Sequence, residues 1–215
     1  MKTLLNDARL YLVLDTQVAD YEQLFAILKQ AVQAGVEIVQ LRDKNGTTRP
    51  MCDFSRRAMA WIERRALFIV NDRLDVAMAC GADGVHLGQD DLPLHEARAL
   101  AGPEMIIGVS CQTMEHVQAA QRDGGADYIG FGSVFQTETK PGRKPMDLRL
   151  LTDVYRWAAV PVFAIGGITL ENLDCVLQTG ADRIAVTRAI SCAPNIGQTV
   201  EAFQRRLHSM SLVKS

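Results

Sequence analysis

The strongest constraint in this sequence is a regular alternation of short apolar runs with longer amphipathic segments along the whole chain. Segments such as 21–34, 113–122 and 170–178 place apolar residues at helical spacing, which predicts amphipathic helices between the runs. Eight runs of four to six residues are bounded by turn residues and indicate buried strands. These predicted strands are residues 10–14, 36–41, 67–70, 84–87, 105–109, 128–131, 162–165 and 183–186.

A partial repeat supports the count of eight strands. Gly81-Ala82-Asp83, Gly125-Ala126-Asp127 and Gly180-Ala181-Asp182 precede the fourth, sixth and eighth strands, and Gly35-Val36-Glu37 is a looser copy before the second. Each glycine falls where a helix commonly ends in a left-handed residue. Copies 44 and 55 positions apart span two βα units and therefore mark alternate strands of one closed barrel.

We therefore predict an α/β protein with one domain, a TIM (β/α)8 barrel covering residues 1–215, with mobile chain ends. The alternative is an open, doubly wound, Rossmann-like sheet. Eight units without a long linker favour closure over that alternative. The 215 residues, 48% of them hydrophobic, can bury one substantial core and lie near the lower size limit for such a barrel.

Composition excludes several classes of partner. The net charge of −2 gives no positive field to hold nucleic acid. Five scattered cysteines, odd in number and without a Cys-x-x-Cys pair, suit a reducing compartment better than a disulfide framework. No run of about 18 apolar residues offers a membrane span. We expect a cytoplasmic protein that binds small molecules, and the sequence leaves its oligomeric state open.

Polar side chains cluster where the predicted strands end, which is where TIM barrels bind ligands. Alternation along the second strand turns Gln40, Arg42 and Lys44 to one side, toward the barrel mouth. Two cations and an amide suit a phosphate-bearing ligand, because arginine binds two oxygens at once. The alternative interpretation is a polar strand end that is merely solvated.

The third and fourth strands deliver carboxylates to the same rim. Asp72 follows the third strand and Asp91 follows the fourth, and a few oxygen ligands suffice for Mg2+ when a substrate diphosphate supplies the rest. The alternative is that each aspartate caps its following helix, at 74–79 or 94–100. For His86, the alternative to a role in ligand binding is that it is a hydrogen-bonded interior histidine.

The remaining strand ends offer further phosphate partners. Ser110 lacks a Gly-x-Ser-x-Gly elbow, so we assign it hydrogen bonding and not nucleophilic attack. The loop after the sixth strand, 130–143, is longer than most connections and carries threonines and Lys140, although a solvated surface loop is the alternative. Gly166-Gly167 and Thr187-Arg188 follow the last two strands, a frequent phosphate site in TIM barrels.

These positions define two separable anion sites. One is a backbone-type monophosphate site at the seventh and eighth strands. The other is a site for a metal and cations, spread over the ends of the second, third, fourth and sixth strands. Two anion sites at one mouth predict a reaction between two phosphorylated substrates.

In this order, the motifs resemble those of thiamine-phosphate synthases. The matching strings cover nearly the whole predicted barrel: 40–44 (QLRDK), 71–72 (ND), 83–91 (DGVHLGQDD), 107–110 (IGVS), 130–132 (GFG), 137–140 (TETK), 165–168 (IGGI) and 185–190 (AVTRAI). Each string is modest by itself, and the ordered set is specific.

The resemblance implies a role for each matching residue. Residues for the pyrimidine diphosphate would be Gln40, Arg42, Lys44, Asn71, His86, Ser110 and Lys140. Asp72 and Asp91 would hold the Mg2+ cofactor. Residues for the thiazole phosphate would be Thr137, Glu138, Thr139, Gly167, Thr187 and Arg188.

The implied chemistry needs no protein nucleophile. The pyrimidine methylene carbon loses pyrophosphate to give a stabilised carbocation, which the thiazole nitrogen captures with its own lone pair. Arg42, Lys44 and Lys140 would be the catalytic residues, because they stabilise the negative charge that grows on the leaving diphosphate. Holding the two substrates in line supplies the rest of the acceleration.

The chain departs from the family pattern at several positions. Arg73 replaces a third acidic residue, Asp43 a glutamate, Ser133 and Gln136 two prolines, and Thr187-Arg188 a Val-Ser pair. Without the prolines the loop after the sixth strand is less pre-organised, because proline restricts the unbound chain. Arg188 either strengthens phosphate binding or redirects it.

Three rival functions fit parts of this pattern. A thiazole tautomerase, an isomerase acting on one phosphorylated thiazole, needs no diphosphate site, and the presence of Asp72, Asp91 and Lys140 argues against it. A non-catalytic barrel that binds a phospholigand would bind without turnover. A sugar-phosphate epimerase would require an acid and a base that the sequence does not place.

Overall fold

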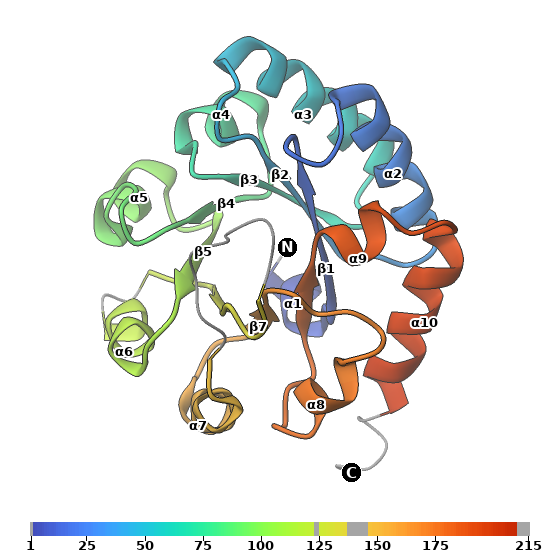
Figure 1. Cartoon of the computed structure of the whole chain (residues 1–215). Coiled ribbons are helices and arrows are strands. Elements are labelled where there is room, and N and C mark those ends of the chain that lie inside the picture. Colours follow the sequence, from blue (N-terminus) through green and yellow to red (C-terminus); the bar gives the residue numbers. More distant parts are fainter. Residues whose placement is uncertain (1, 123–124, 137–145, 210–215) are drawn as a thin grey trace.

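Eight parallel strands close into a barrel in the computed structural model, which describes residues 2–122, 125–136 and 146–209. Neighbouring strands follow sequence order, and β8 pairs back onto β1 through Leu10 and Ile184 (Figure 1). This closure confirms the predicted TIM barrel and excludes the open sheet. The strands are β1 (Leu10–Asp15), β2 (Ile38–Arg42), β3 (Leu67–Asn71), β4 (Gly84–Leu87), β5 (Ile106–Cys111), β6 (Tyr128–Phe131), β7 (Val162–Ile165) and β8 (Ile184–Val186).

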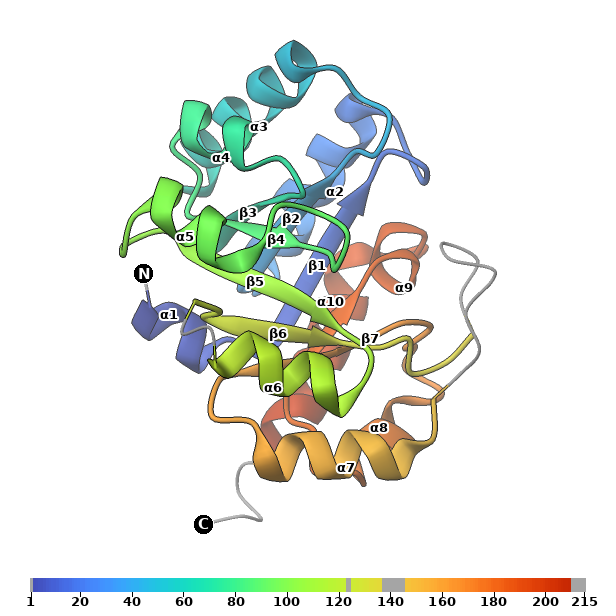
Figure 2. The same ribbon diagram turned by 90° about the vertical axis from the view of Figure 1, so that its left-hand side faces the viewer.

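Helices surround the barrel (Figure 1). They are α1 (Lys2–Asp7), α2 (Tyr21–Gln33), α3 (Thr48–Ile62), α4 (Leu74–Cys80), α5 (Leu94–Ala101), α6 (Met114–Arg122), α7 (Leu148–Trp157), α8 (Leu173–Leu177), α9 (Arg188–Ser191) and α10 (Ile196–Ser209). Helix α1, which the apolar pattern does not predict, lies at the end where the strands begin (Figure 2). Its Leu5 is buried with the barrel interior, so α1 closes the floor opposite the mouth.

Several predicted boundaries differ from the structure by one to three residues, and two of the differences have local reasons. Strand β2 begins at Ile38 and not at residue 36, because the Val36 N–H donates to the Ala31 carbonyl and completes the end of α2. The predicted helix 170–178 contracts to Leu173–Leu177. There the Asn172 side chain accepts from the Thr169 N–H and donates to the Gly167 carbonyl, which holds the preceding residues in a turn.

The apolar core has two parts. The larger lies between the outer face of the strands and the helices. The smaller fills the barrel itself, where Tyr11, Tyr128 and Phe163 pack with ring centroids 5.4–5.8 Å apart. The interior below the mouth is therefore packed with side chains, and TIM barrels bind their ligands at the end where the strands finish.

The repeated acidic residues have a shared structural role that the sequence pattern did not reveal. Glu37 accepts from the Leu10 N–H, Asp83 from the Phe68 N–H and Asp127 from the Ile107 N–H, at 2.8–2.9 Å. Each therefore ties the start of one strand to the start of its neighbour. The fourth copy differs, because Asp182 pairs with the Arg9 and Arg183 guanidinium groups. Gly35, Gly81 and Gly180 have the predicted positive φ angles, at +104°, +70° and +93°.

This role predicts an order of stabilities. Asp127→Ala is expected to cost about 1–3 kcal/mol, because it leaves the buried Ile107 N–H without its acceptor. Asp182→Ala, in the same repeat position, is expected to cost less than about 1 kcal/mol, because it removes only partly exposed ion pairs. Denaturant unfolding of both variants checks the order, and equal losses would contradict the stabilising role of the bond between the Asp127 carboxylate and the Ile107 N–H.

Two further observations bear on the expectations drawn from composition. All five cysteines are free thiols, as their irregular spacing indicates. Within the described ranges, no helix is long and apolar enough to cross a membrane.

Candidate active site

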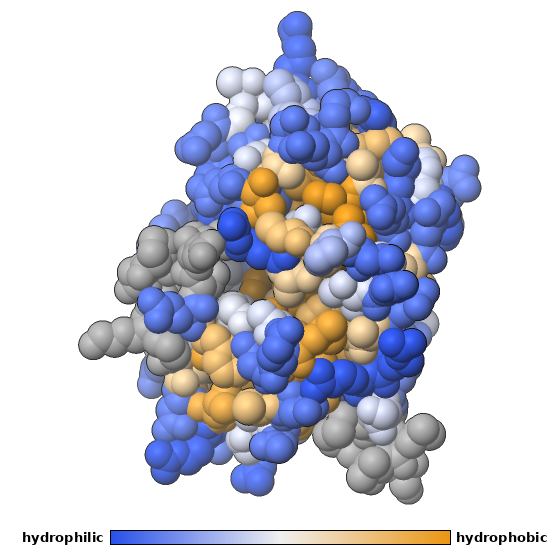
Figure 3. Space-filling model, turned by 45° about the vertical axis from the view of Figure 1, so that its right-hand side comes forward, coloured by the Kyte–Doolittle hydropathy of each residue, from blue (hydrophilic) through white to orange (hydrophobic). Residues whose placement is uncertain are grey.

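A cavity of about 460 Å³ opens at the ends of the strands, within the usual range for small-molecule sites. Apolar side chains gather in a hollow of the surface, and hydrophilic side chains surround it (Figure 3). Gln40, Arg42, Asn71, His86 and Ser110 line one part of the cavity. Gly167, Thr187 and Arg188 line another, so eight of the predicted site residues share one space.

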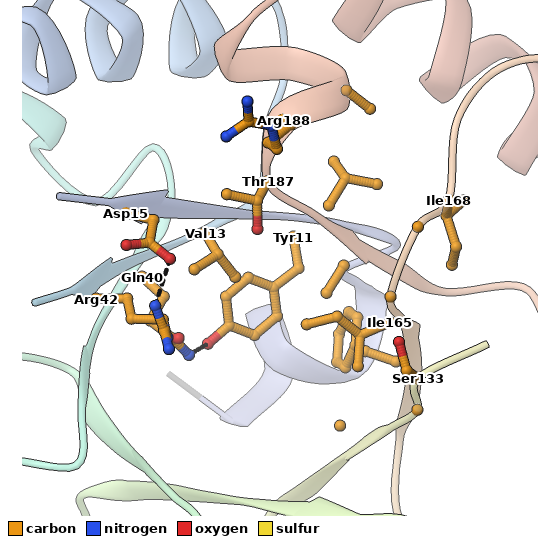
Figure 4. A pocket seen from close by; sticks show the side chains of 18 of the residues that line it. Tyr11, Val13, Asp15, Gln40, Arg42, Ser133, Ile165, Ile168, Thr187 and Arg188 are labelled. Atoms are coloured by element: carbon orange, nitrogen blue, oxygen red, sulfur yellow. Dashed lines mark hydrogen bonds and ion pairs between the residues drawn. The ribbon is translucent and has the colours of Figure 1, made fainter. Parts of the chain in front are cut away.

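Arg42 is held by a partner that the sequence analysis missed. Its Nη1 lies 2.5 Å from Oδ2 of Asp15, which ends β1 and is fully buried (Figure 4). Strand register brings them together, because Asp15 and Arg42 are direct neighbours across β1 and β2. The other carboxylate oxygen of Asp15 accepts from the Gln17 N–H. One signal in the sequence could have revealed this pair. Asp15 is a charged residue at the end of an otherwise apolar strand, and a buried carboxylate requires a partner.

Lys44 lies beyond the end of β2 and pairs with the Asp72 carboxylate. The Asp91 carboxylate is close enough to Asp72 to affect its ionisation. Burial raises the pKa of Asp72, and the Asp91 carboxylate raises that pKa further against the opposing effect of Lys44. Carboxylates from the ends of β3 and β4 thus converge beside a lysine from the end of β2.

The alternative capping role of these aspartates is not what the structure shows. Arg73 occupies the N-cap of α4 and Pro93 that of α5, and neither makes a side-chain cap bond. Asp91 instead accepts from the Gly88 N–H within its own loop, at 2.7 Å. Asp72 has φ +61°, a left-handed conformation that few residues other than glycine, asparagine and aspartate adopt and that is often found at functional sites.

A metal site here would rest on a pair of protein ligands. Among residues 2–122, 125–136 and 146–209, no group of three or more histidine, cysteine, aspartate or glutamate side chains is arranged to hold an ion. Two adjacent carboxylate groups nevertheless match the oxygen donors that Mg2+ takes when a substrate diphosphate completes its shell.

His86 and Ser110 are joined on the cavity wall. His86 Nε2 lies 2.9 Å from Ser110 Oγ, and His86 Nδ1 lies 3.0 Å from the Tyr128 hydroxyl. His86 is therefore a hydrogen-bonded interior histidine, as the plain alternative held, and it also faces the cavity. Where a nucleophilic triad places a carboxylate at Nδ1 of the histidine, His86 Nδ1 meets the Tyr128 hydroxyl.

The two glycines after β7 have a packing reason as well as a possible binding role. Gly166 and Gly167 have φ angles of +108° and +65°. A Cβ at Gly166 would lie 2.2 Å from Ser133 Oγ, and one at Gly167 would lie 2.4 Å from the Gln136 carbonyl oxygen. Only glycine therefore lets the loop after β7 approach the loop after β6. The sequence analysis predicts the pair only as part of a phosphate site.

Four predicted residues of the loop after β6, Thr137, Glu138, Thr139 and Lys140, lie outside the described residues. Their expected roles stay predictions. Thr187 and Arg188 are described, at the start of α9, where they line the cavity.

Comparison with known proteins decides the family. The model of the family described as "Thiamine monophosphate synthase" matches residues 10–190, from β1 to α9. The chain belongs to the thiamine monophosphate synthase family. A thiamine-phosphate synthase of Gloeobacter violaceus is 46% identical over 97% of this chain and 60% of its own length. One from Halalkalibacterium halodurans is 38% identical over 97% of the chain and 99% of its own length.

A solved structure supports the same family. Thiamine phosphate pyrophosphorylase from Pyrococcus furiosus superposes with a TM-score of 0.85 at 35% identity, covering 96% of this chain and 98% of that one. The chain spans about three fifths of the Gloeobacter relative, so that longer member of the thiamine monophosphate synthase family contains sequence without a counterpart here. The match of family and fold agrees with the resemblance inferred from the strand-end motifs.

Proposed function

We propose that this protein is a thiamine-phosphate synthase, a transferase that joins an aminopyrimidine diphosphate to a thiazole phosphate and releases pyrophosphate. One observation carries the proposal. Arg42 lines the same cavity as Gly167, Thr187 and Arg188, and a separate group of Lys44, Asp72 and Asp91 follows the ends of β2, β3 and β4. The family to which the chain belongs supplies the substrate class.

The first substrate occupies the side formed by β2 to β5. Arg42 and Lys44, with Lys140 from the loop after β6, bind the diphosphate, and the pyrimidine lies against Gln40, Asn71, His86 and Ser110. The thiazole phosphate binds across the cavity at Gly167, Thr187 and Arg188, with Thr137, Glu138 and Thr139. Both substrates are then held in one cavity, which replaces a bimolecular encounter by an aligned pair.

Mg2+ is the proposed cofactor, with Asp72 and Asp91 as its protein ligands. The fit rests on the adjacent carboxylates, whose mutual repulsion helps to raise the pKa of Asp72 and would be relieved by a cation. Bound there, Mg2+ would neutralise charge developing on the leaving diphosphate.

The protein side chains have an electrostatic and positioning task. Asp15 fixes the Arg42 guanidinium through one nitrogen, so the remaining donors can bind diphosphate oxygens. Charge on those oxygens grows as the bond from the methylene carbon breaks, and preorganised cations stabilise it without rearrangement. The thiazole nitrogen attacks with its own lone pair, so no side chain has to remove a proton.

Five free thiols agree with a reducing compartment, and we place the protein in the cytoplasm.

A pyrophosphate-release assay tests the function. Release is expected only when both substrates and Mg2+ are present, and chelation by EDTA is expected to abolish it reversibly. Release that is insensitive to EDTA would contradict the metal assignment. Interconversion of thiazole phosphate isomers without pyrophosphate would favour a tautomerase. Binding of thiazole phosphate without any product would favour a non-catalytic barrel.

A further inference from the structure

Five polar side chains form one continuous chain across the barrel interior. Gln40 Nε2 donates to the Tyr11 hydroxyl at 2.6 Å, and the Tyr11 and Tyr128 hydroxyls lie 2.8 Å apart (Figure 4 shows the first of these bonds). Tyr128 then meets His86 Nδ1 at 3.0 Å, and His86 Nε2 meets Ser110 Oγ at 2.9 Å. All five line the cavity, and the chain links β2 to β5 through β1, β6 and β4.

Counting protons gives this chain of hydrogen bonds a direction. An amide nitrogen only donates, so the Tyr11 oxygen accepts from Gln40 and its single proton goes to the Tyr128 oxygen. Tyr128 must then donate its own proton to Nδ1 of His86. A neutral imidazole that accepts at Nδ1 carries its proton on Nε2, and it donates that proton to Ser110 Oγ. Burial raises the pKa of both phenols, so both keep the protons that this counting requires.

The surrounding backbone keeps the rings in place. Gly108 pairs with Tyr128 on β6 and with His86 on β4. A Cβ at Gly108 would lie 2.0 Å from Cζ of Tyr128, and one at Gly130 would lie 3.1 Å from Cε1 of His86. Phe163 packs edge-on against both tyrosine rings, at interplanar angles of 85°. Glycine backbone on one side and aromatic packing on the other hold the two tyrosine rings, and with them the hydroxyl oxygens, in position.

We propose that Tyr11 and Tyr128 are positioning residues. Because Gln40 donates at one end of the hydrogen-bond chain, they fix Ser110 as a hydrogen-bond donor to the cavity at the other end. The cavity then presents a fixed pair of groups, the Gln40 carbonyl oxygen as acceptor and the Ser110 hydroxyl proton as donor. A heteroaromatic ring that offers a donor toward β2 and a lone pair toward β5 matches this pair. The aminopyrimidine of the proposed function has both, and the assignment of that ligand rests on the proposed function.

The first test needs no substrate. Nitrogen NMR of the full-length protein, with labelled histidine and His86→Asn for assignment, reports which ring nitrogen of His86 carries the proton. The direction derived above predicts a neutral His86 protonated at Nε2. Protonation at Nδ1 would show that the chain runs in the opposite sense and would overturn the proposal, whatever the protein catalyses.

The second test breaks the relay, that is, the hydrogen-bond chain that runs from Gln40 through Tyr11, Tyr128 and His86 to Ser110. Tyr128→Phe is expected to leave His86 as a mixture of tautomers and to raise KM for the aminopyrimidine diphosphate about tenfold, with KM for the thiazole phosphate unchanged. Tyr155→Phe is the matched control, because this partly buried hydroxyl donates to the Val162 and Arg183 carbonyls outside the relay. A pure Nε2–H tautomer in Tyr128→Phe, or an equal rise in both KM values, would contradict the relay. A wild-type Nε2–H tautomer without any product would instead refute the proposed function alone.

Discussion

Arg42→Ala is expected to lower turnover about 10²- to 10³-fold, because a preorganised cation on the leaving diphosphate is lost. The same change is expected to cost about 3–5 kcal/mol of unfolding free energy, because the fully buried Asp15 carboxylate loses its partner. Steady-state kinetics and denaturant unfolding measure the two effects separately.

A second substitution separates the two roles of Arg42. Asp15→Asn, added to Arg42→Ala, removes the unpaired charge and is expected to restore most of the lost stability. Turnover is expected to stay low, because no guanidinium returns to the cavity. If turnover recovered together with stability, Arg42 would be a structural residue only.

Asp91→Asn is expected to reduce turnover about 10²- to 10³-fold while the unfolding free energy stays within about 1 kcal/mol of the wild type. The pKa of Asp72 is higher in the folded protein than in the unfolded chain, so ionisation of Asp72 destabilises the folded state as the pH rises between these two pKa values. Removing the neighbouring Asp91 carboxylate reduces this destabilisation at neutral pH. An asparagine oxygen can still accept from the Gly88 N–H. Kinetics at several Mg2+ concentrations, with thermal unfolding, check the separation.

Asp90→Asn is the matched control for Asp91. Asp90 is the preceding residue, its side chain is exposed, and the same charge is removed from the same loop. We expect almost no change in turnover or in the Mg2+ concentration that gives half-maximal rate. Parallel losses of melting temperature and activity in Asp91→Asn would mean that this carboxylate only supports the loop.

The barrel was predictable because its signals are local. Apolar runs such as 67–70 and 128–131 report burial directly, and the glycines at 35, 81 and 180 mark the ends of helices. Errors of a residue or two arose where a backbone bond extended a helix end, as at Val36. Helix α1 was missed because it is short and its main buried residue, Leu5, packs into the barrel floor, a contact that periodicity does not encode.

The candidate site was only half visible in the sequence. Residue types that suit phosphate binding, such as Arg42 and Gly167, stand at strand ends, so their place beside the cavity could be predicted by position. Asp15, Tyr11 and Tyr128 were missed, because their roles depend on partners 27 to 117 positions away. Their burial makes them resemble ordinary core residues until the barrel brings those partners together.

The proposal of two separate anion sites at one barrel mouth is tested most directly by binding. Calorimetric titration of thiazole phosphate into protein saturated with pyrophosphate and Mg2+ tests it. Separate sites predict that one equivalent of thiazole phosphate still binds, and that Arg188→Ala weakens this binding more than Arg42→Ala does. Complete displacement of one ligand by the other would show a single shared site and would contradict a condensation of two bound substrates.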